Sequence, residues 1–262
     1  MTFMQFGIQM YTLRDFMKTR EDLAQTLHRV AALGYTNVQI TKPGYLTYPE
    51  MQAMLAGCGL RADSVLCPVY DIPRSLDDIT KAARILGTDV LRTDSIREED
   101  RYSVAGYESF ARHLNRCGKA LHERGLKFMY HFHSFEWIKL GDTRGIDILL
   151  AQTDPAWVMF QPDVFWLTAA GTEPSQSLKR FAGRAEYLHL KDYTIVAANT
   201  GTLETIRWAS APVGTGNLNW DGILATAKEI GIRNFVVEDD MGILDPFDSA
   251  AQSIAAMKSF GF

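Results

Sequence analysis

The chain has 262 residues, of which 47% are hydrophobic, and a formal net charge of −4 at pH 7. A chain of this size and composition can bury a large core. The small negative charge and the lack of a basic block argue against nucleic acid as a partner, because binding to phosphate backbones needs clustered Lys and Arg. No apolar run approaches the roughly 20 residues of a membrane-spanning helix, so no membrane partner is expected.

The N-terminus and the cysteines indicate in which cellular compartment the protein is found. The opening MTFMQFGIQMYTL has no positive residues ahead of its apolar stretch, unlike a signal peptide. Cys58, Cys67 and Cys117 are odd in number and lack C-x-x-C spacing. We therefore expect a cytoplasmic protein with reduced, buried thiols.

Apolar strand-like runs alternate with helical patterns along the whole chain. The expected strands lie at about 5–9, 36–40, 61–66, 89–93, 127–132, 157–163, 186–191 and 234–238. The expected helices lie at 20–33, 48–59, 75–87, 104–125, 143–152, 174–183, 219–231 and 245–260. Thr19 or Ser75 can serve as an N-cap, and several helices end in a C-capping glycine, namely Gly34, Gly59, Gly87, Gly125 and Gly231. This order without a linker predicts an α/β fold, a single (β/α)₈ TIM barrel that forms one domain over 1–262.

The segment 193–220 interrupts this regular order. It is too long for an ordinary strand-to-helix connection and follows the strand that carries His189. Active sites of such barrels lie at the C-terminal ends of the strands, so the segment falls on that face. We expect a lid over the site or a wall of its pocket; a surface hairpin without a catalytic part is the alternative.

Four strand ends carry side chains that hard metal ions prefer. The stretches are HFHSFE (131–136), FQPDVFW (160–166), YLHLKD (187–192) and FVVEDD (235–240). They place Glu136, Asp163, His189 and Glu238 on successive strands, where the barrel geometry lets them converge. An oxygen-rich set with one histidine suits Mn²⁺, Mg²⁺ or a catalytic Zn²⁺ better than a structural zinc, which favours thiolates.

Six motifs, in register over nearly the whole chain, resemble the sugar phosphate isomerase/epimerase family. They are FGIQMYTLRD, YHFHSFEW, FQPDVFWLTAAGTEP, HLKD, VGTGNLNW and VVEDD. The family belongs to the xylose isomerase-like barrel superfamily, with inosose dehydratases, ketose 3-epimerases and endonuclease IV. The resemblance places that family's metal ligands on the same residues, Glu136, Asp163, His189 and Glu238.

The resemblance implies an isomerase or epimerase that acts on a sugar or keto-polyol with one divalent ion as cofactor. The ion acts as a Lewis acid on the carbonyl, and a carboxylate removes the neighbouring carbon-bound proton. In related epimerases two glutamates flank the substrate, which here implies Glu136 and Glu238 as base and acid. Lys191 lies two positions after His189, on the same side of the strand, and can oppose oxyanion charge or bind substrate.

Four other side chains are expected to contact the substrate. His131 and His133 alternate on one strand, and we assign His133 to the substrate and His131 to a structural or outer-shell role. Trp166 follows Asp163 by three residues and is expected to cover the apolar side of the pocket. Gln39 and Arg92 end their strands and can reach substrate oxygens.

The departures from the family pattern leave other reactions open. Trp166 stands where ketose 3-epimerases have a histidine, and Ile195 stands where they have an arginine. A dehydratase (lyase) of the inosose or dehydroshikimate type begins with the same proton abstraction and is the main alternative. Endonuclease IV needs extra zinc-binding histidines that this chain lacks. A barrel that binds sugar without catalysis is the alternative of another class, and a homo-oligomer, common among such relatives, is a further possibility.

Overall fold

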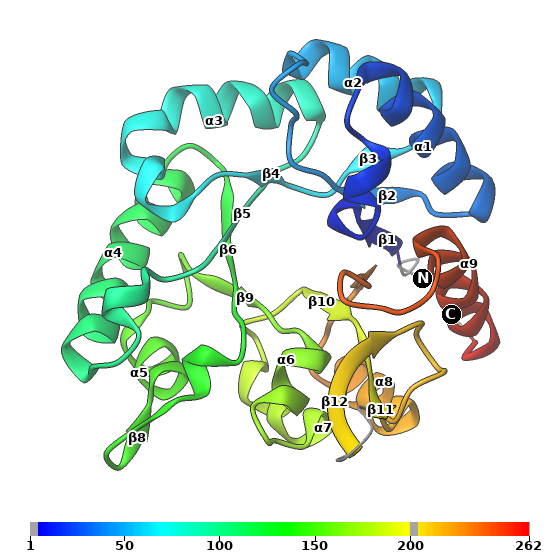
Figure 1. The fold of residues 1–262 in the computed structure, drawn as a ribbon. Helices are drawn as coiled ribbons and strands as arrows, with labels where there is room; N and C mark the ends of the chain where they lie inside the picture. The colour runs from blue at the N-terminus through cyan, green and yellow to red at the C-terminus, as the bar shows by residue number, and fades with distance from the viewer. Residues whose placement is uncertain (1–4, 200–203, 262) are drawn as a thin grey trace.

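Parallel strands form the inner wall of a (β/α)₈ barrel in the computed structural model, which describes residues 5–199 and 204–261 (Figure 1). The barrel strands are β1 Gln5–Gln9, β2 Asn37–Gln39, β3 Arg61–Ala62, β4 Val65–Leu66, β5 Val90–Asp94, β6 Lys127–His131, β9 Met159–Gln161, β10 Tyr187–Leu190 and β13 Asn234–Val237. β3 and β4 are two halves of the single strand expected at 61–66. The strands expected from the sequence are thus confirmed, within a residue or two at their ends.

Two parallel sheets make up this wall. Their strand orders are β10-β13-β1-β2-β3 and β4-β5-β6-β9. The chain joins the sheets between β3 and β4, and a parallel bridge from Asp163 to His189 joins them between β9 and β10. The wall therefore closes at two predicted site residues.

Helices surround the wall (Figure 1). They are α1 Arg20–Leu33, α2 Tyr48–Gly57, α3 Ile72–Leu86, α4 Val104–His122, α5 Gly145–Gln152, α6 Val164–Ala169, α7 Pro174–Leu178, α8 Trp220–Glu229 and α9 Pro246–Ser259. Short 3₁₀ turns are η1 Met10–Phe16, η2 Val69–Asp71, η3 Glu98–Asp100, η4 Phe135–Trp137 and η5 Lys179–Phe181. The sequence pattern did not indicate α6. No helix in the described ranges is long and apolar enough to cross a membrane.

Capping residues set several helix ends. Thr19 forms a capping box with Asp22 at the start of α1. Gly34 ends that helix at φ 102°, a left-handed conformation that glycine adopts without the steric cost of a Cβ. The N-cap expected at Ser75 is wrong, because α3 already begins at Ile72.

The barrel interior is layered. Val90, Met129, Tyr187 and Val236 form a small buried apolar cluster on β5, β6, β10 and β13. Side chains on a strand alternate between its two faces, so the residues two positions later point into the barrel one layer higher. Those residues are Arg92, His131, His189 and Glu238. The apolar layer therefore acts as a floor beneath a layer of polar side chains.

The segment 193–220 contains an antiparallel hairpin. Its strands are β11 Asp192–Asn199 and β12 Glu204–Ala211; residues 200–203 lie outside the described ranges, as do residues 1–4 and 262 of the predicted domain. Asp192 anchors the hairpin base and is buried. Its carboxylate accepts hydrogen bonds from the backbone N–H groups of Tyr193, Gly214, Gly216 and Leu218 and from the Trp220 indole. A second, smaller hairpin joins β7 Lys139–Leu140 to β8 Thr143–Arg144.

The carboxyl of Asp63, between β3 and β4, should make the stability of the folded protein depend on pH. Burial raises the pKa of its carboxyl to about 7, against the hydrogen bond from Asn37. The folded-state pKa of Asp63 lies above the unfolded value of about 3.8. The contribution of this group to the free energy of unfolding is therefore complete below pH 3.8 and is lost as the pH rises through 7. Asp63→Asn cannot ionise, so it should stabilise the fold at pH 8 by up to about 4 kcal/mol and change it little at acid pH.

Thermal unfolding of the wild type and Asp63→Asn at several pH values, with a chelator in every sample, measures this effect. Asp77→Asn is the matched control, because the Asp77 side chain is 99% exposed. An equal difference in Tm between wild type and Asp63→Asn at all pH values would contradict the assignment.

Candidate active site and metal centre

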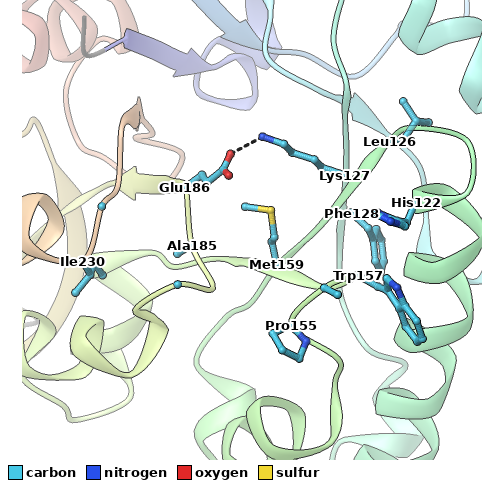
Figure 2. A pocket seen from close by; sticks show the side chains of 13 residues that line it. His122, Leu126, Lys127, Phe128, Pro155, Trp157, Met159, Ala185, Glu186 and Ile230 are labelled. Atoms are coloured by element: carbon cyan, nitrogen blue, oxygen red, sulfur yellow. Dashed lines mark hydrogen bonds and ion pairs between the residues drawn. The ribbon is translucent and has the colours of Figure 1, made fainter. Parts of the chain in front are cut away.

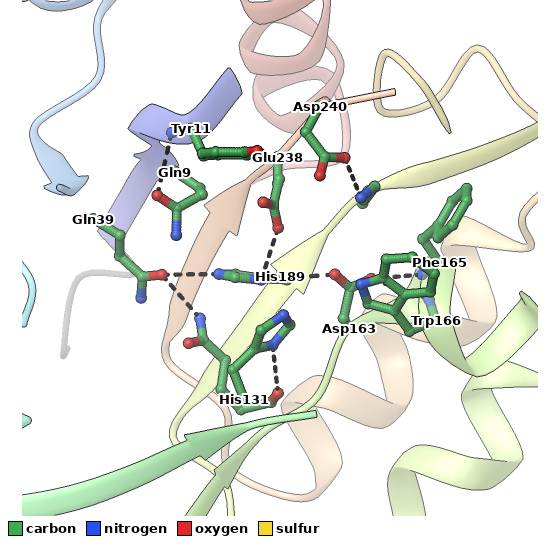
Figure 3. A network of polar contacts seen from close by, with 12 residues as sticks. Gln9, Tyr11, Gln39, His131, Asp163, Phe165, Trp166, His189, Glu238 and Asp240 are labelled. Atoms are coloured by element: carbon green, nitrogen blue, oxygen red, sulfur yellow. Dashed lines mark hydrogen bonds and ion pairs between the residues drawn. The ribbon is translucent and has the colours of Figure 1, made fainter. Parts of the chain in front are cut away.

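Four buried side chains meet at the C-terminal ends of β6, β9, β10 and β13 (Figure 3). They are His131, Asp163, His189 and Glu238, and their potential ligand atoms all lie within 4.8 Å of one another. The structure thus brings together three of the four predicted metal-binding residues. His131, which we assigned an outer role, completes this group.

Gln39 orients the His189 ring. Its Oε1 atom lies 2.8 Å from His189 Nε2 and 3.4 Å from the Nε2 atom of Gln161, so it accepts from both. With Nε2 donating to Gln39, Nδ1 of His189 faces the two carboxylates and is the nitrogen that would bind a metal ion. This is the usual outer-shell support of a metal-binding histidine. Gln39 is fully buried and does not line the cavity described below.

His131 and Asp163 are oriented by the backbone. Nδ1 of His131 donates to the carbonyl of Gln161 at 3.3 Å, so in the neutral ring the lone pair is on Nε2. Asp163 caps α6, where its Oδ1 accepts from the N–H groups of Phe165 and Trp166. Its other oxygen, Oδ2, lies 3.6 Å from Nδ1 of His189.

The charges in the group are strongly coupled. Burial alone would lower the pKa of His189, but the Glu238 carboxylate at 3.0 Å and Asp163 raise it above its ordinary value. Burial would raise the pKa of Glu238, and the charges of His189 and Lys191 lower it. Burial and the neighbouring His189 hold the pKa of His131 well below its ordinary value, which keeps this imidazole neutral, the form that binds metals.

The donor atoms of this group fit a divalent cation. Asp163 Oδ2 and Glu238 Oε2 both face Nδ1 of His189, at 3.6 Å and 3.0 Å, so three potential ligand atoms gather at one buried point. A cation at that point would favour the ionised form of both carboxylates. Two carboxylates and two imidazoles carry a charge that a divalent ion neutralises. The residues that would hold it are His131, Asp163, His189 and Glu238.

Glu136 lies apart from this group, in η4. Its carboxylate is fully buried and accepts hydrogen bonds from the Tyr130 hydroxyl and from the backbone N–H of His133. Burial raises the pKa of this carboxyl to about 7, although both hydrogen bonds oppose the shift. In this arrangement Glu136 braces the turn that carries His133.

Lys191 is buried beside the group. Its ammonium pairs with Asp240 and lies 4.8 Å and 4.9 Å from the ring centroids of Phe165 and Trp166. Burial opposes its charge, but the carboxylates around it, Glu238 first, raise its pKa above the ordinary value. Lys191 is therefore protonated and positively charged.

A cavity of about 300 Å³ opens above the metal-binding group. His131, His189 and Glu238 form part of its wall, with Arg92 and His133 from the predicted substrate-binding set. The remaining lining residues are Gln9, Tyr11, Thr41, Leu66, Asp94 and Asp240. No described residue of the 193–220 segment lines this cavity, although the Trp208 ring packs at 5.5 Å on Phe165.

His133 and Trp166 occupy one side of the site. The His133 ring stacks on Phe135 with centroids 5.1 Å apart and lies 5.2 Å from the Trp166 ring. Its Nδ1 atom has no hydrogen-bond partner among the described residues. Trp166 packs on Lys191 and His133 and is not itself part of the cavity wall.

A larger hollow, of about 420 Å³, lies at the opposite end of the barrel (Figure 2). Lys127 and Glu186, at the N-terminal ends of β6 and β10, form an ion pair of 2.8 Å across it. Trp157 and Met159 contribute apolar walls. N-terminal ends of barrel strands serve stability, and the charges here satisfy each other, so the smaller polar cavity is the better candidate for catalysis.

The sequence analysis missed two features of the site. His131 lies with Asp163, His189 and Glu238 because it ends β6 and points inward, whereas Glu136 lies five residues beyond the strand. The H-x-H alternation carried this signal. Asp94 and Asp240 line the cavity as well; the strand-end position of Asp94, two residues after Arg92, was the available sign.

Comparisons with known proteins agree with this architecture. A family model described as "Xylose isomerase-like TIM barrel" matches residues 27–260. An inosose dehydratase from Geobacillus kaustophilus (strain HTA426) is 24% identical over 258 residues, which cover 86% of this chain and 83% of the relative.

Two solved structures share the fold. A sugar phosphate isomerase/epimerase from Parabacteroides distasonis is 24% identical at a TM-score of 0.76, over 98% of this chain and 94% of that one. A xylose isomerase-like protein from Mycobacterium smegmatis, in complex with magnesium, is 16% identical at a TM-score of 0.69, over 98% and 96%.

Proposed function

Because the chain belongs to the xylose isomerase-like TIM barrel family, we propose that it is a divalent-metal-dependent enzyme acting on a small keto-sugar or keto-polyol. The reaction begins with removal of the proton next to the carbonyl. The observation that carries this proposal is the convergence of His131, Asp163, His189 and Glu238 beneath a polar cavity. A cavity of about 300 Å³ is at the lower end of the range for small-molecule sites.

The metal centre has a specific chemical part. A bound divalent ion supplies Lewis-acid polarisation of the carbonyl, which acidifies the neighbouring C–H group. Two imidazoles and two carboxylates favour Mn²⁺ or Zn²⁺ over Mg²⁺, which prefers oxygen ligands alone.

The surrounding side chains divide the remaining tasks. Glu238 belongs to the ligand group and lines the cavity, so its carboxylate can accept the substrate proton. The charged ammonium of Lys191 lies beside it and opposes the negative charge that develops as the proton leaves. Arg92 and His133 contact the substrate from the cavity wall.

Proton abstraction can end in isomerisation, in epimerisation or in loss of water. The buried, engaged position of Glu136 argues against epimerisation. Epimerisation needs a second group that returns a proton on the opposite face of the substrate, and the Glu136 carboxylate is already engaged by Tyr130 and His133. Dehydration needs only one carboxylate: Glu238 takes the proton from carbon and returns it to the departing β-hydroxyl, which leaves as water. A dehydratase is therefore the second candidate, and the inosose dehydratase relative supports it.

Proton NMR in D₂O tests the proposal. With Mn²⁺ or Zn²⁺ supplied, the protein should exchange the proton α to the carbonyl of at least one compound in a panel of ketoses and inososes. A new enone without the β-hydroxyl identifies dehydration, and a stereoisomer identifies epimerisation. If no compound exchanges, the enzymatic proposal is overturned in favour of a sugar-binding role.

A further inference from the structure

Arg92 and Asp94 form a polar pair in the cavity wall, on the side of β5. They lie two residues apart on the strand, so both side chains point into the barrel. Nη1 of Arg92 lies 3.4 Å from Oδ2 of Asp94. The Arg92 side chain is 5% exposed and that of Asp94 is 38% exposed, so a buried cation adjoins a carboxylate that is open to the cavity.

The pair has unused hydrogen-bonding capacity. The Nε–H group of Arg92 is buried and has no acceptor among the described residues. A buried donor without a partner is unfavourable, and a ligand oxygen in the cavity that Arg92 lines could supply the acceptor. The Asp94 carboxylate, with one oxygen near Arg92, keeps lone pairs that can accept a hydrogen bond from the same ligand.

The backbone after Asp94 is strained. Ser95 has φ 66° and is the only non-glycine residue with positive φ in the described ranges. A left-handed conformation at such a residue is unfavourable and tends to persist at functional sites. Here the turn ends β5 directly after Asp94.

The combination of donor and acceptor decides which oxygen the pair can bind. A hydroxyl both accepts a hydrogen bond, from Arg92, and donates one, to Asp94. A phosphate or carboxylate has no proton to donate at neutral pH and would face the charge of Asp94. Glu238 belongs to the proposed ligand group and Asp240 pairs with Lys191, so their charges are offset and Asp94 accounts for this repulsion.

We propose that Arg92 and Asp94 together recognise one hydroxyl of an uncharged polyol substrate and select against phosphorylated analogues. The inference rests on the proposed function for the site and narrows its substrate class. Asp94 is a specificity-determining residue in this scheme, because its charge separates a neutral hydroxyl from an anion.

The matched probes are myo-inositol and myo-inositol 1-phosphate, which lack a carbonyl and report binding without turnover. Calorimetry on the wild type should show tighter binding of myo-inositol. Asp94→Asn should weaken that binding by about tenfold or more, as expected for loss of a charged hydrogen bond. The same variant should bind the phosphate more tightly than the wild type does. Glu99→Gln, which removes one exposed negative charge after the same strand, is the control and should match the wild type.

Four results would overturn the inference. They are wild-type preference for the phosphate, wild-type binding of neither probe, an Asp94→Asn variant that behaves like Glu99→Gln, and an Asp94→Asn variant that loses affinity for both probes alike. The last result would mean that Asp94 only supports the fold. Deuterium exchange on the inosose and ketose panel separates this inference from the proposed function. If the wild type exchanges deuterium and the Asp94→Asn variant keeps the wild-type preference between the two probes, only the role of the Arg92 and Asp94 pair is refuted. If the wild type does not exchange deuterium but Asp94→Asn alters the preference between the probes, only the proposed reaction is refuted.

Discussion

Replacement of His131 by alanine is expected to weaken Mn²⁺ or Zn²⁺ binding by more than about 100-fold, the upper end of the effect of losing an outer-shell partner. His131 is neutral and its Nε2 atom is not used by the Gln161 carbonyl, so it is free to bind a metal. Glu136→Gln should keep the metal, because the Glu136 oxygens accept hydrogen bonds from Tyr130 and His133. Elemental analysis after dialysis, together with titration of the metal-free protein, measures both effects.

A double variant extends this test. Asp163→Asn with Glu238→Gln removes both carboxylates of the group and should also abolish metal uptake, while circular dichroism confirms that the protein is folded. Metal uptake by the double variant equal to that of the wild type would place the site elsewhere. The opposite result for the single variants, with metal lost in Glu136→Gln and kept in His131→Ala, would restore the ligand set that the sequence pattern indicated.

Replacement of Lys191 by methionine is expected to lower kcat by about 10²–10³-fold, the usual cost of removing one donor that stabilises transition-state charge. The ammonium lies close to the rings of Phe165 and Trp166 and next to Asp240, in a buried environment that strengthens its electrostatic effect. Metal content should remain that of the wild type. Single-turnover kinetics on the compound identified by the deuterium-exchange panel, with metal analysis of the same sample, measures the effect.

The variant also leaves the partly buried Asp240 carboxylate without its cation, which is destabilising. The double variant Lys191→Met, Asp240→Asn removes this imbalance. It should recover thermal stability without recovering kcat. If turnover returns together with stability, Lys191 supports the structure and not the chemistry.

The position of the ligand group could be predicted only in part. Asp163, His189 and Glu238 lie at strand ends or within two residues beyond them, where inward alternation is simple to follow. Glu136 follows a turn, and the path of a turn depends on its tertiary contacts. The 3₁₀ turn η4 carries its carboxylate to the Tyr130 hydroxyl and away from the metal-binding group.

Only some of the predicted substrate-binding residues lie in the cavity wall. Arg92 and His133 are in the cavity wall, as their alternation on β5 and β6 indicated. Gln39 also points inward but lies below the cavity, where it orients His189. The distance of a side chain from the cavity depends on the height of its layer, and short strands such as β2 do not reveal that height in the sequence.

By itself the sequence determined the barrel, because apolar strands, amphipathic helices and capping glycines such as Gly34 and Gly87 are local signals with local causes. It also determined that acidic and histidine side chains gather at the C-terminal strand ends. Only the tertiary structure decided that His131 lies with Asp163, His189 and Glu238, that Glu136 lies apart from them, and that Arg92 and Asp94 face one cavity. Those outcomes depend on contacts between segments far apart in the chain, whose distances no local pattern encodes.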